Sequence, residues 1–146
     1  MRKMIYLLLI FCLVLATTIG CNNKSDSGFS KVERQDIPKE VRNFIDRTSE
    51  ENGIYLYSNN IIDDYLFLNA INVKKGEKAA FFTDVKFEIE EHTLKISFNE
   101  KLTADDSNYA QKIDNMLIYK IKLSKEFDTI IVFKNGEAVP LDAVGT

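Results

Sequence analysis

The sequence predicts a mainly β fold: an antiparallel β-sandwich or small open barrel of about seven strands, with one short N-terminal amphipathic helix after a flexible tether. From Ile54 onward, apolar residues recur at every second position, which is the period of a half-buried strand. Short polar turns separate these runs. Before them, residues 38–50 have the helical period instead.

The predicted helix spans residues 38–50. Four apolar side chains fall on one face, at offsets of zero, four, seven and eight: Ile37, Val41, Phe44 and Ile45. Asp36 is the expected cap, and Pro38 suits the first turn because its missing N–H would have no partner there. Asn52-Gly53 offers a stop after the helix. Packing on the domain is the favoured interpretation, and docking to a partner is the alternative.

Seven segments have the composition and alternation of strands. They are residues 54–57, 65–68, 81–90, 94–99, 117–123, 129–133 and 138–144. The second is apolar on both faces, which predicts a central strand, and 129–133 is expected to be the most buried. Glu91-His92 forms the tip of a hairpin between the third and fourth segments. Asn135-Gly136 predicts a second hairpin because this pair accepts positive φ angles, and Pro140 limits the last strand to an edge.

The N-terminus has the pattern of an export signal. Arg2 and Lys3 precede an apolar run from Met4 to Ile19, and small residues lead into Cys21. The run of 16 residues would extend about 24 Å as a helix, short of the roughly 30 Å hydrocarbon core of a bilayer. The pattern therefore favours a cleaved signal over an uncleaved anchor helix.

The segment Thr18-Ile19-Gly20-Cys21 resembles the lipobox of bacterial lipoproteins, although Thr18 stands where leucine is most common. In that class, the cysteine thiol receives a diacylglycerol and a type II signal peptidase cuts before the cysteine. The resemblance implies a signal peptide at 1–20, lipidation of Cys21 and a lipid-anchored location on the extracytoplasmic face of the cell membrane. The whole pattern is similar to small lipoproteins of low-GC Gram-positive bacteria, without identifying a family for the domain.

Cleavage at this position would leave 126 residues. Residues 21–35 are predicted to be a flexible tether, and residues 36–146 one β-rich extracytoplasmic domain of common size. Cys12 would leave with the signal, so Cys21 would be the only thiol and no internal disulfide is expected. Loss of the two basic residues of the signal would leave 17 basic and 22 acidic residues, a balance of −5. This charge argues against a nucleic-acid partner.

The sequence contains no recognisable catalytic pattern, and no cofactor or metal is expected. His92 is the one histidine and lies at a predicted hairpin tip, which excludes a His-based zinc site, a Cys–His pair and an oriented Ser–His–Asp triad. Asp105-Asp106, followed by Ser107 and Asn108, forms a cluster of oxygen ligands but lacks the spacing of a calcium loop. Asp63-Asp64 is a second acidic pair. Solvated turns are the favoured interpretation of both pairs, and ion binding at Asp105-Asp106 stays open.

Most tyrosines and phenylalanines follow the core-facing period, as a small β core requires. Tyr57 and Tyr109 are less clearly inward and are candidates to line a binding surface. Three classes of function stay open. A non-catalytic binding or adaptor module, acting on an envelope protein or a small ligand, is favoured by the absence of catalytic patterns. The alternatives are a carboxylate-based enzyme or enzyme inhibitor of the cell envelope, and a purely structural role.

Overall fold

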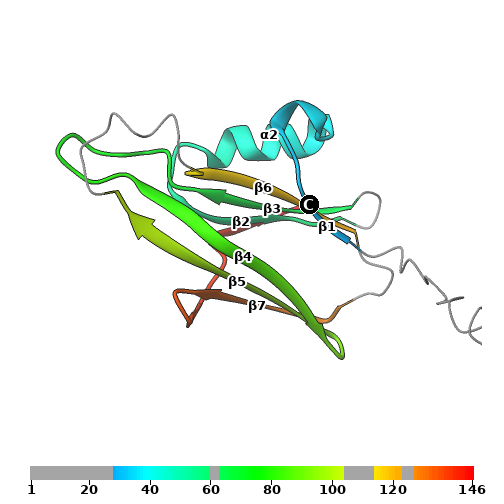
Figure 1. The fold of residues 1–146 in the computed structure, drawn as a ribbon. Helices are drawn as coiled ribbons and strands as arrows, with labels where there is room; N and C mark the ends of the chain where they lie inside the picture. Colours follow the sequence, from blue (N-terminus) through cyan, green and yellow to red (C-terminus); the bar gives the residue numbers. More distant parts are fainter. Residues whose placement is uncertain (1–27, 60–62, 104–113, 123–126) are drawn as a thin grey trace, which may run out of the picture.

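The computed structural model describes residues 28–59, 63–103, 114–122 and 127–146. Within these ranges, nine strands form two mixed sheets that face each other, and one α-helix covers the outer side of one sheet (Figure 1). The sheets stay open at their edges and do not close into a barrel. The prediction of a mainly β sandwich with one N-terminal helix is confirmed.

The first sheet has five strands in the order β1-β6-β3-β2-β9. Their bounds are β1 Gly28–Lys31, β6 Met116–Lys122, β3 Asp64–Asn69, β2 Gly53–Tyr57 and β9 Ala143–Gly145. As its apolar sequence predicts, β3 lies in the centre, where every residue after Asp64 is buried. The pairs are antiparallel except β2 with β9, which is parallel.

The second sheet has four strands in the order β4-β5-β7-β8. Their bounds are β4 Ala80–Glu90, β5 Thr93–Leu102, β7 Thr129–Lys134 and β8 Glu137–Val139. The predicted hairpin tips at Glu91-His92 and at Asn135-Gly136 are both present. The β5–β7 pair is parallel, which corrects the antiparallel expectation. Between these two strands the chain crosses to the first sheet as β6, so β7 re-enters the second sheet in the direction of β5.

Two strands differ from the predicted set. Residues 28–31 were expected to belong to a flexible tether, but they form β1 and pair with β6. The predicted strand 138–144 is divided into β8 and β9, which lie in different sheets. Pro140 lies at the break, where its missing N–H cannot continue the ladder. Beyond it, Asp142 bonds Ile54 twice, through its backbone N–H and its carboxylate, and holds β9 beside β2.

The helix α2, Lys39–Thr48, is shorter than predicted but buries the predicted apolar face. Asp36 does not cap it, because this residue ends a short 3-10 helix, Arg34–Asp36, and Pro38 takes the cap position without a side-chain bond. The helix packs on the first sheet, and one hydrophobic core fills the space between the helix and this sheet. The buried residues of this core are Ile37, Val41, Phe44, Ile45, Tyr55, Tyr57, Tyr65, Phe67 and Ile118.

A second and larger core fills the space between the sheets. It includes the fully buried side chains of Leu66, Leu68, Leu94 and Ile96. The expectation that 129–133 would be the most buried strand is wrong, since β7 buries Val132 alone. The outer face of the second sheet has no layer over it among the described elements, so Ile131 and Phe133 stay partly exposed.

A bulge interrupts β4 between Thr83 and Lys86. Asp84 has a φ of 56° there, and its carboxylate accepts hydrogen bonds from Thr83 Oγ1 at 2.8 Å and Asn99 Nδ2 at 3.0 Å. These bonds favour the ionised carboxylate and hold the pKa of Asp84 below its ordinary value of 3.8. The ionised Asp84 side chain therefore stabilises the fold at neutral pH.

Because the pKa of Asp84 is lower in the folded chain, its contribution is lost as the pH falls below 3.8 through the folded value. We expect Asp84→Asn, which tolerates the same backbone angle, to lose less stability than the native chain between pH 4 and pH 2, roughly the range of carboxylate titration. Urea unfolding at several pH values measures this difference. If the free energy of unfolding fell equally with pH in the native chain and in Asp84→Asn, the stabilising role of the ionised Asp84 carboxylate would be contradicted.

Candidate functional site

The molecule has two distinct ends along its strands. Cys21, the predicted lipid site, lies outside the described residues. Gly28 follows it by seven positions and pairs with Lys122 at one end of the first sheet. The tip at Glu91-His92 lies at this same end (Figure 1). We call this the anchor end, defined by Gly28, Lys122, Glu91 and His92.

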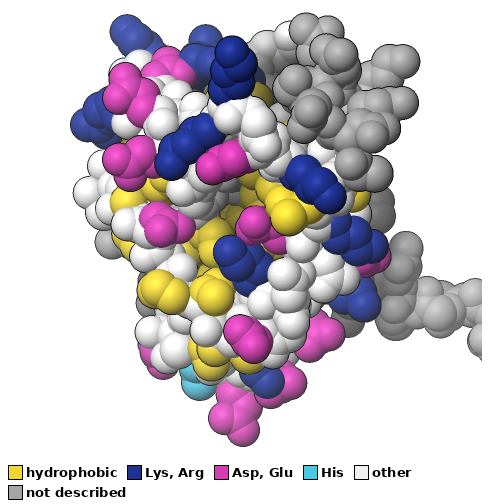
Figure 2. Space-filling model, turned by 90° about the vertical axis from the view of Figure 1, so that its left-hand side faces the viewer, with side chains coloured by type: hydrophobic (Ala, Val, Ile, Leu, Met, Phe, Trp, Pro, Cys, Tyr) yellow, Lys and Arg dark blue, Asp and Glu magenta, His cyan; other side chains and the backbone are white. Residues whose placement is uncertain are grey.

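The opposite end, which we call the far end, carries three exposed apolar side chains, which we call the apolar cluster because they share this end of the domain. It consists of Leu102, Ile71 and Met116, which are 64%, 40% and 37% exposed. Five large hydrophobic side chains in the described part of the chain are exposed, and these three lie at the far end. Figure 2 faces this end and shows hydrophobic side chains exposed from its middle to its lower part, with charged side chains among and around them.

Backbone pairing brings the three segments of the cluster to one place. Met116 pairs with Asn69, two residues before Ile71, and Leu102 pairs with Ala80. The Phe82 N–H donates to the Asp114 carbonyl at 2.9 Å, which joins the second sheet to the segment that precedes β6. The far end is therefore a junction of both sheets.

The support beneath Ile71 is a network of asparagine side chains. Asn69 is buried, and its Nδ2 donates to the carbonyls of Ser49 at 3.1 Å and Glu51 at 2.7 Å. Asn52 and Asn72 exchange two further bonds, at 2.8 and 2.9 Å. These bonds fix the end of α2 to the end of β3, so the backbone around Ile71 is held by satisfied polar groups.

Exposed lysines lie beside the apolar cluster: Lys74, Lys75, Lys78 and Lys101. The first two belong to a turn that the Glu77 N–H closes on the Lys74 carbonyl at 3.0 Å, with Gly76 at a φ of 86°. An apolar centre with charged residues beside it is the usual composition of a protein-binding surface.

Sequence reasoning missed the far-end cluster. Each of its three residues was taken as part of a loop or as the first position before a strand. The only signal in the sequence is an apolar residue next to a turn, which is common on protein surfaces. The cluster appears only when the pairing of β3, β4, β5 and β6 is known.

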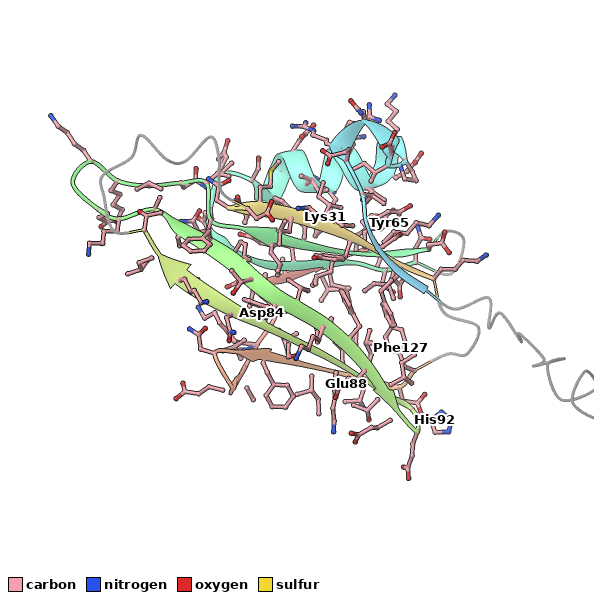
Figure 3. The ribbon with its side chains drawn as sticks, viewed as in Figure 1. Lys31, Tyr65, Asp84, Glu88, His92 and Phe127 are labelled. Carbon is pink, nitrogen blue, oxygen red and sulfur yellow. The ribbon has the colours of Figure 1, made fainter. Side chains whose placement is uncertain are left out.

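His92 lies at the tip between β4 and β5, as the alternation predicts (Figure 3). Its Nδ1 is 4.0 Å from Asp128 Oδ2, and both side chains are largely exposed. Among the residues that the structure describes, neither a pocket nor a buried partner orients the ring, which makes His92 a poor general base.

The two predicted acidic pairs have different outcomes. Asp105-Asp106 and Tyr109 lie outside the described residues. The interpretation of Asp63-Asp64 as a solvated turn is wrong. Asp63 binds Lys120 Nζ at 2.8 Å, and Asp64 begins β3, where burial raises its pKa although a bond from Ser58 opposes the shift. Over the ranges that the structure describes, no group of three or more His, Cys, Asp or Glu side chains has an arrangement able to hold a metal ion.

A shallow hollow of about 590 Å³ lies between α2, the last residue of β2 and the C-terminal residue of the chain. It is lined by Glu40, Asn43, Asp46, Arg47, Tyr57 and Thr146. Asp46 is ion-paired with Arg34. Tyr57, which the sequence left as a candidate binding residue, is buried with its ring 5.6 Å from Phe44 and its hydroxyl bonded to Asn59. Two polar groups of the hollow, the Asp46 carboxylate and the Tyr57 hydroxyl, are therefore already engaged, and we take the far end as the better candidate site.

Within the described part of the chain, no helix has the length and apolar character that crossing a membrane requires. Comparison with known proteins gives no relative: no family model, curated protein or solved structure matches this chain.

Proposed function

We propose that this chain is a lipoprotein held on the extracytoplasmic face of the cell membrane by lipid on Cys21, and that its β domain is a non-catalytic module that binds another envelope protein. The export signal and the lipobox-like segment support the anchor. The exposed apolar cluster at the far end carries the binding proposal. Solvent-exposed leucine, isoleucine and methionine at one end of the domain, with lysines in the neighbouring segments, suit a protein partner better than a small polar ligand.

The position of the cluster suits this role. The seven residues from Cys21 to Ser27 extend at most about 25 Å, which keeps the anchor end close to the bilayer. The 11 residues of β4 rise about 36 Å from one end of the domain to the other. The far end is therefore directed away from the tether and is open to a partner in the envelope.

The alternative of a carboxylate-based enzyme has less support. Its best location would be the hollow at α2, where the Asp46 carboxylate is bound to Arg34. A pair of catalytic carboxylates needs a defined separation of about 5–10 Å across a cleft. Glu40 and Asp46 both line this hollow, but its open shape and the engagement of Asp46 with Arg34 give this alternative less support than the binding module.

Photo-crosslinking in intact cells tests the binding proposal. A crosslinking amino acid at Leu102 should give a discrete adduct with one envelope protein, and one at Thr129, near the anchor end, should not. Met116→Asp should remove the adduct at position 102, because it places a charge in the apolar cluster. Leu102 is exposed, so its replacement should alter stability by no more than about 0.5 kcal/mol. Equal adducts from both positions, or none from position 102, would contradict the proposal.

A further inference from the structure

Strand β4 has an open edge. It lies at the end of the second sheet, and its strand partner there is β5. In the described ranges, it makes one backbone hydrogen bond outside its own sheet, from the Phe82 N–H to the Asp114 carbonyl. The stretch after the bulge, residues 86–90, pairs with β5 in regular register.

The direction of the backbone groups along this stretch follows from the hairpin. The residues that flank a two-residue tip form a hydrogen-bonded pair, and such pairs alternate with open ones along an antiparallel ladder. Glu90, Glu88 and Lys86 therefore direct their N–H and C=O groups toward β5. Phe87 and Ile89 direct theirs toward the open edge, where another strand can bind them.

The side chains of the same stretch are self-complementary in charge. Lys86 and Glu88 are exposed and, as alternate residues of one strand, share the outer face of the sheet on either side of Phe87. Figure 3 shows Glu88 on this strand. In an antiparallel pair centred on Phe87, Lys86 of each copy lies opposite Glu88 of the other. A pair centred on Lys86 would place Lys86 opposite Lys86 and Glu88 opposite Asp84. A pair centred on Glu88 would bring Lys86 opposite Glu90 but would place Glu88 opposite Glu88 at its centre, and like charges directly opposite each other are destabilising.

The apolar residues agree with the same register. Ile89 is 47% exposed although it lies on the core-facing side of β4. In the pair centred on Phe87, it would lie opposite Val85 of the second copy, a residue that packs against the core between the sheets. The pairing would thus cover an apolar side chain that the single chain leaves in water.

We propose that two copies of this chain bind each other through β4, antiparallel and centred on Phe87, so that the two four-stranded sheets become one sheet across a two-fold axis. Charged edge residues and bulges usually prevent such pairing. Here the bulge at Asp84 and Val85 lies at the start of the paired stretch. Lys86 and Glu88 have opposite charges and attract in this register, and Glu90 is ion-paired with Lys95 of its own chain.

The tether position is compatible with this dimer. Phe29 of β1 stacks on Phe87 with ring centroids 4.5 Å apart and planes within 5°. The strand that follows the tether therefore begins beside the centre of the interface, and the two tethers leave the dimer near its axis. Both can reach one membrane, and confinement there raises the effective concentration of the partner. The surface is separate from the far end, so this proposal does not need the envelope partner.

Disulfide crosslinking of the full chain in its membrane tests the register. One copy carries Lys86→Cys and one epitope tag, and the other carries Glu88→Cys and a different tag. These positions would form a non-hydrogen-bonded pair with Cα atoms about 4.5 Å apart, within disulfide range. We expect a mixed disulfide on oxidation, and at most about a tenth as much when both copies carry Lys101→Cys, which lies on β5 away from the edge. The native chain, treated with the same oxidant, measures any disulfide that forms through Cys21 instead of the introduced cysteines.

A charge exchange tests the interaction itself, with co-purification of the two tags as the readout. Lys86→Glu turns both attractive pairs into repulsive ones and should weaken the dimer about tenfold. Lys86→Glu combined with Glu88→Lys should restore it, while Lys101→Glu, with the same change in net charge, should have no effect. Equal crosslinking at positions 86/88 and 101, absence of a mixed disulfide, or failure of the double exchange to restore pairing would overturn the proposal.

Discussion

Cys21→Ala is expected to move the protein from the membrane fraction to the medium, or to leave it with an uncut signal peptide. Each buried CH₂ group of an acyl chain contributes about 0.8 kcal/mol, and two chains together give stable attachment. Removal of the thiol removes the site at which both chains would be joined. Fractionation of cells and medium, followed by N-terminal sequencing, measures the location and the cleavage.

Cys12→Ala is the matched control for this experiment. Both variants lose one thiol, but Cys12 lies inside the apolar run that leaves with the signal. The control should therefore keep its processing and its membrane location. If Cys21→Ala stayed cleaved and membrane-bound to the same extent as Cys12→Ala, attachment would not depend on a lipid at Cys21.

Leu94→Ala is expected to lower the free energy of unfolding by about 2–5 kcal/mol, the usual range for a fully buried leucine. The Leu94 side chain lies in the core between the sheets and has no solvent-exposed area. Its removal leaves a cavity that two hydrogen-bonded sheets cannot easily close. Urea unfolding followed by far-UV circular dichroism measures the loss.

The same strand supplies a matched control, since Leu102→Ala deletes the same atoms from an exposed side chain at the other end of β5. We expect a change within about 0.5 kcal/mol for this variant. Similar losses for both variants would contradict the placement of the core, because burial is what distinguishes the two leucines.

The local parts of the fold were predictable from sequence, because local chemistry specifies them. Alternation from Val85 to Phe98 predicted the β4–β5 hairpin with its tip at Glu91-His92, whereas the bulge before Lys86 places Phe82, and not Phe81 as the alternation predicted, in the core. The Asn135-Gly136 turn was also predictable, since Asn135 and Gly136 have φ values of 53° and 85°. In such segments the periodicity and the turn residues agree, and no distant contact is needed to interpret them.

The parts that depend on distant contacts were not predictable. The β1 sequence Gly-Phe-Ser-Lys has one large apolar residue, and it becomes a strand through pairing with β6 and through the stack of Phe29 on Phe87. The parallel pairing of β5 with β7 results from the passage of the chain through the first sheet. Alternation alone does not show which strands will be neighbours, or in which direction.

The candidate surfaces show the same division. The charges of Lys86 and Glu88 were visible in the sequence and were correctly placed on an exposed face. Their self-complementarity matters only because β4 lies at an edge. Ile71, Leu102 and Met116 come from three separate segments, and only the folded chain brings them to one end.

Mass spectrometry of the mature protein extracted from membranes tests the anchor most directly. We predict that the N-terminal peptide begins at Cys21 and carries the added mass of a diacylglycerol on its sulfur. A membrane-associated chain with a free Cys21 thiol, or one that still retains residues 1–20, would contradict attachment through lipid at this residue.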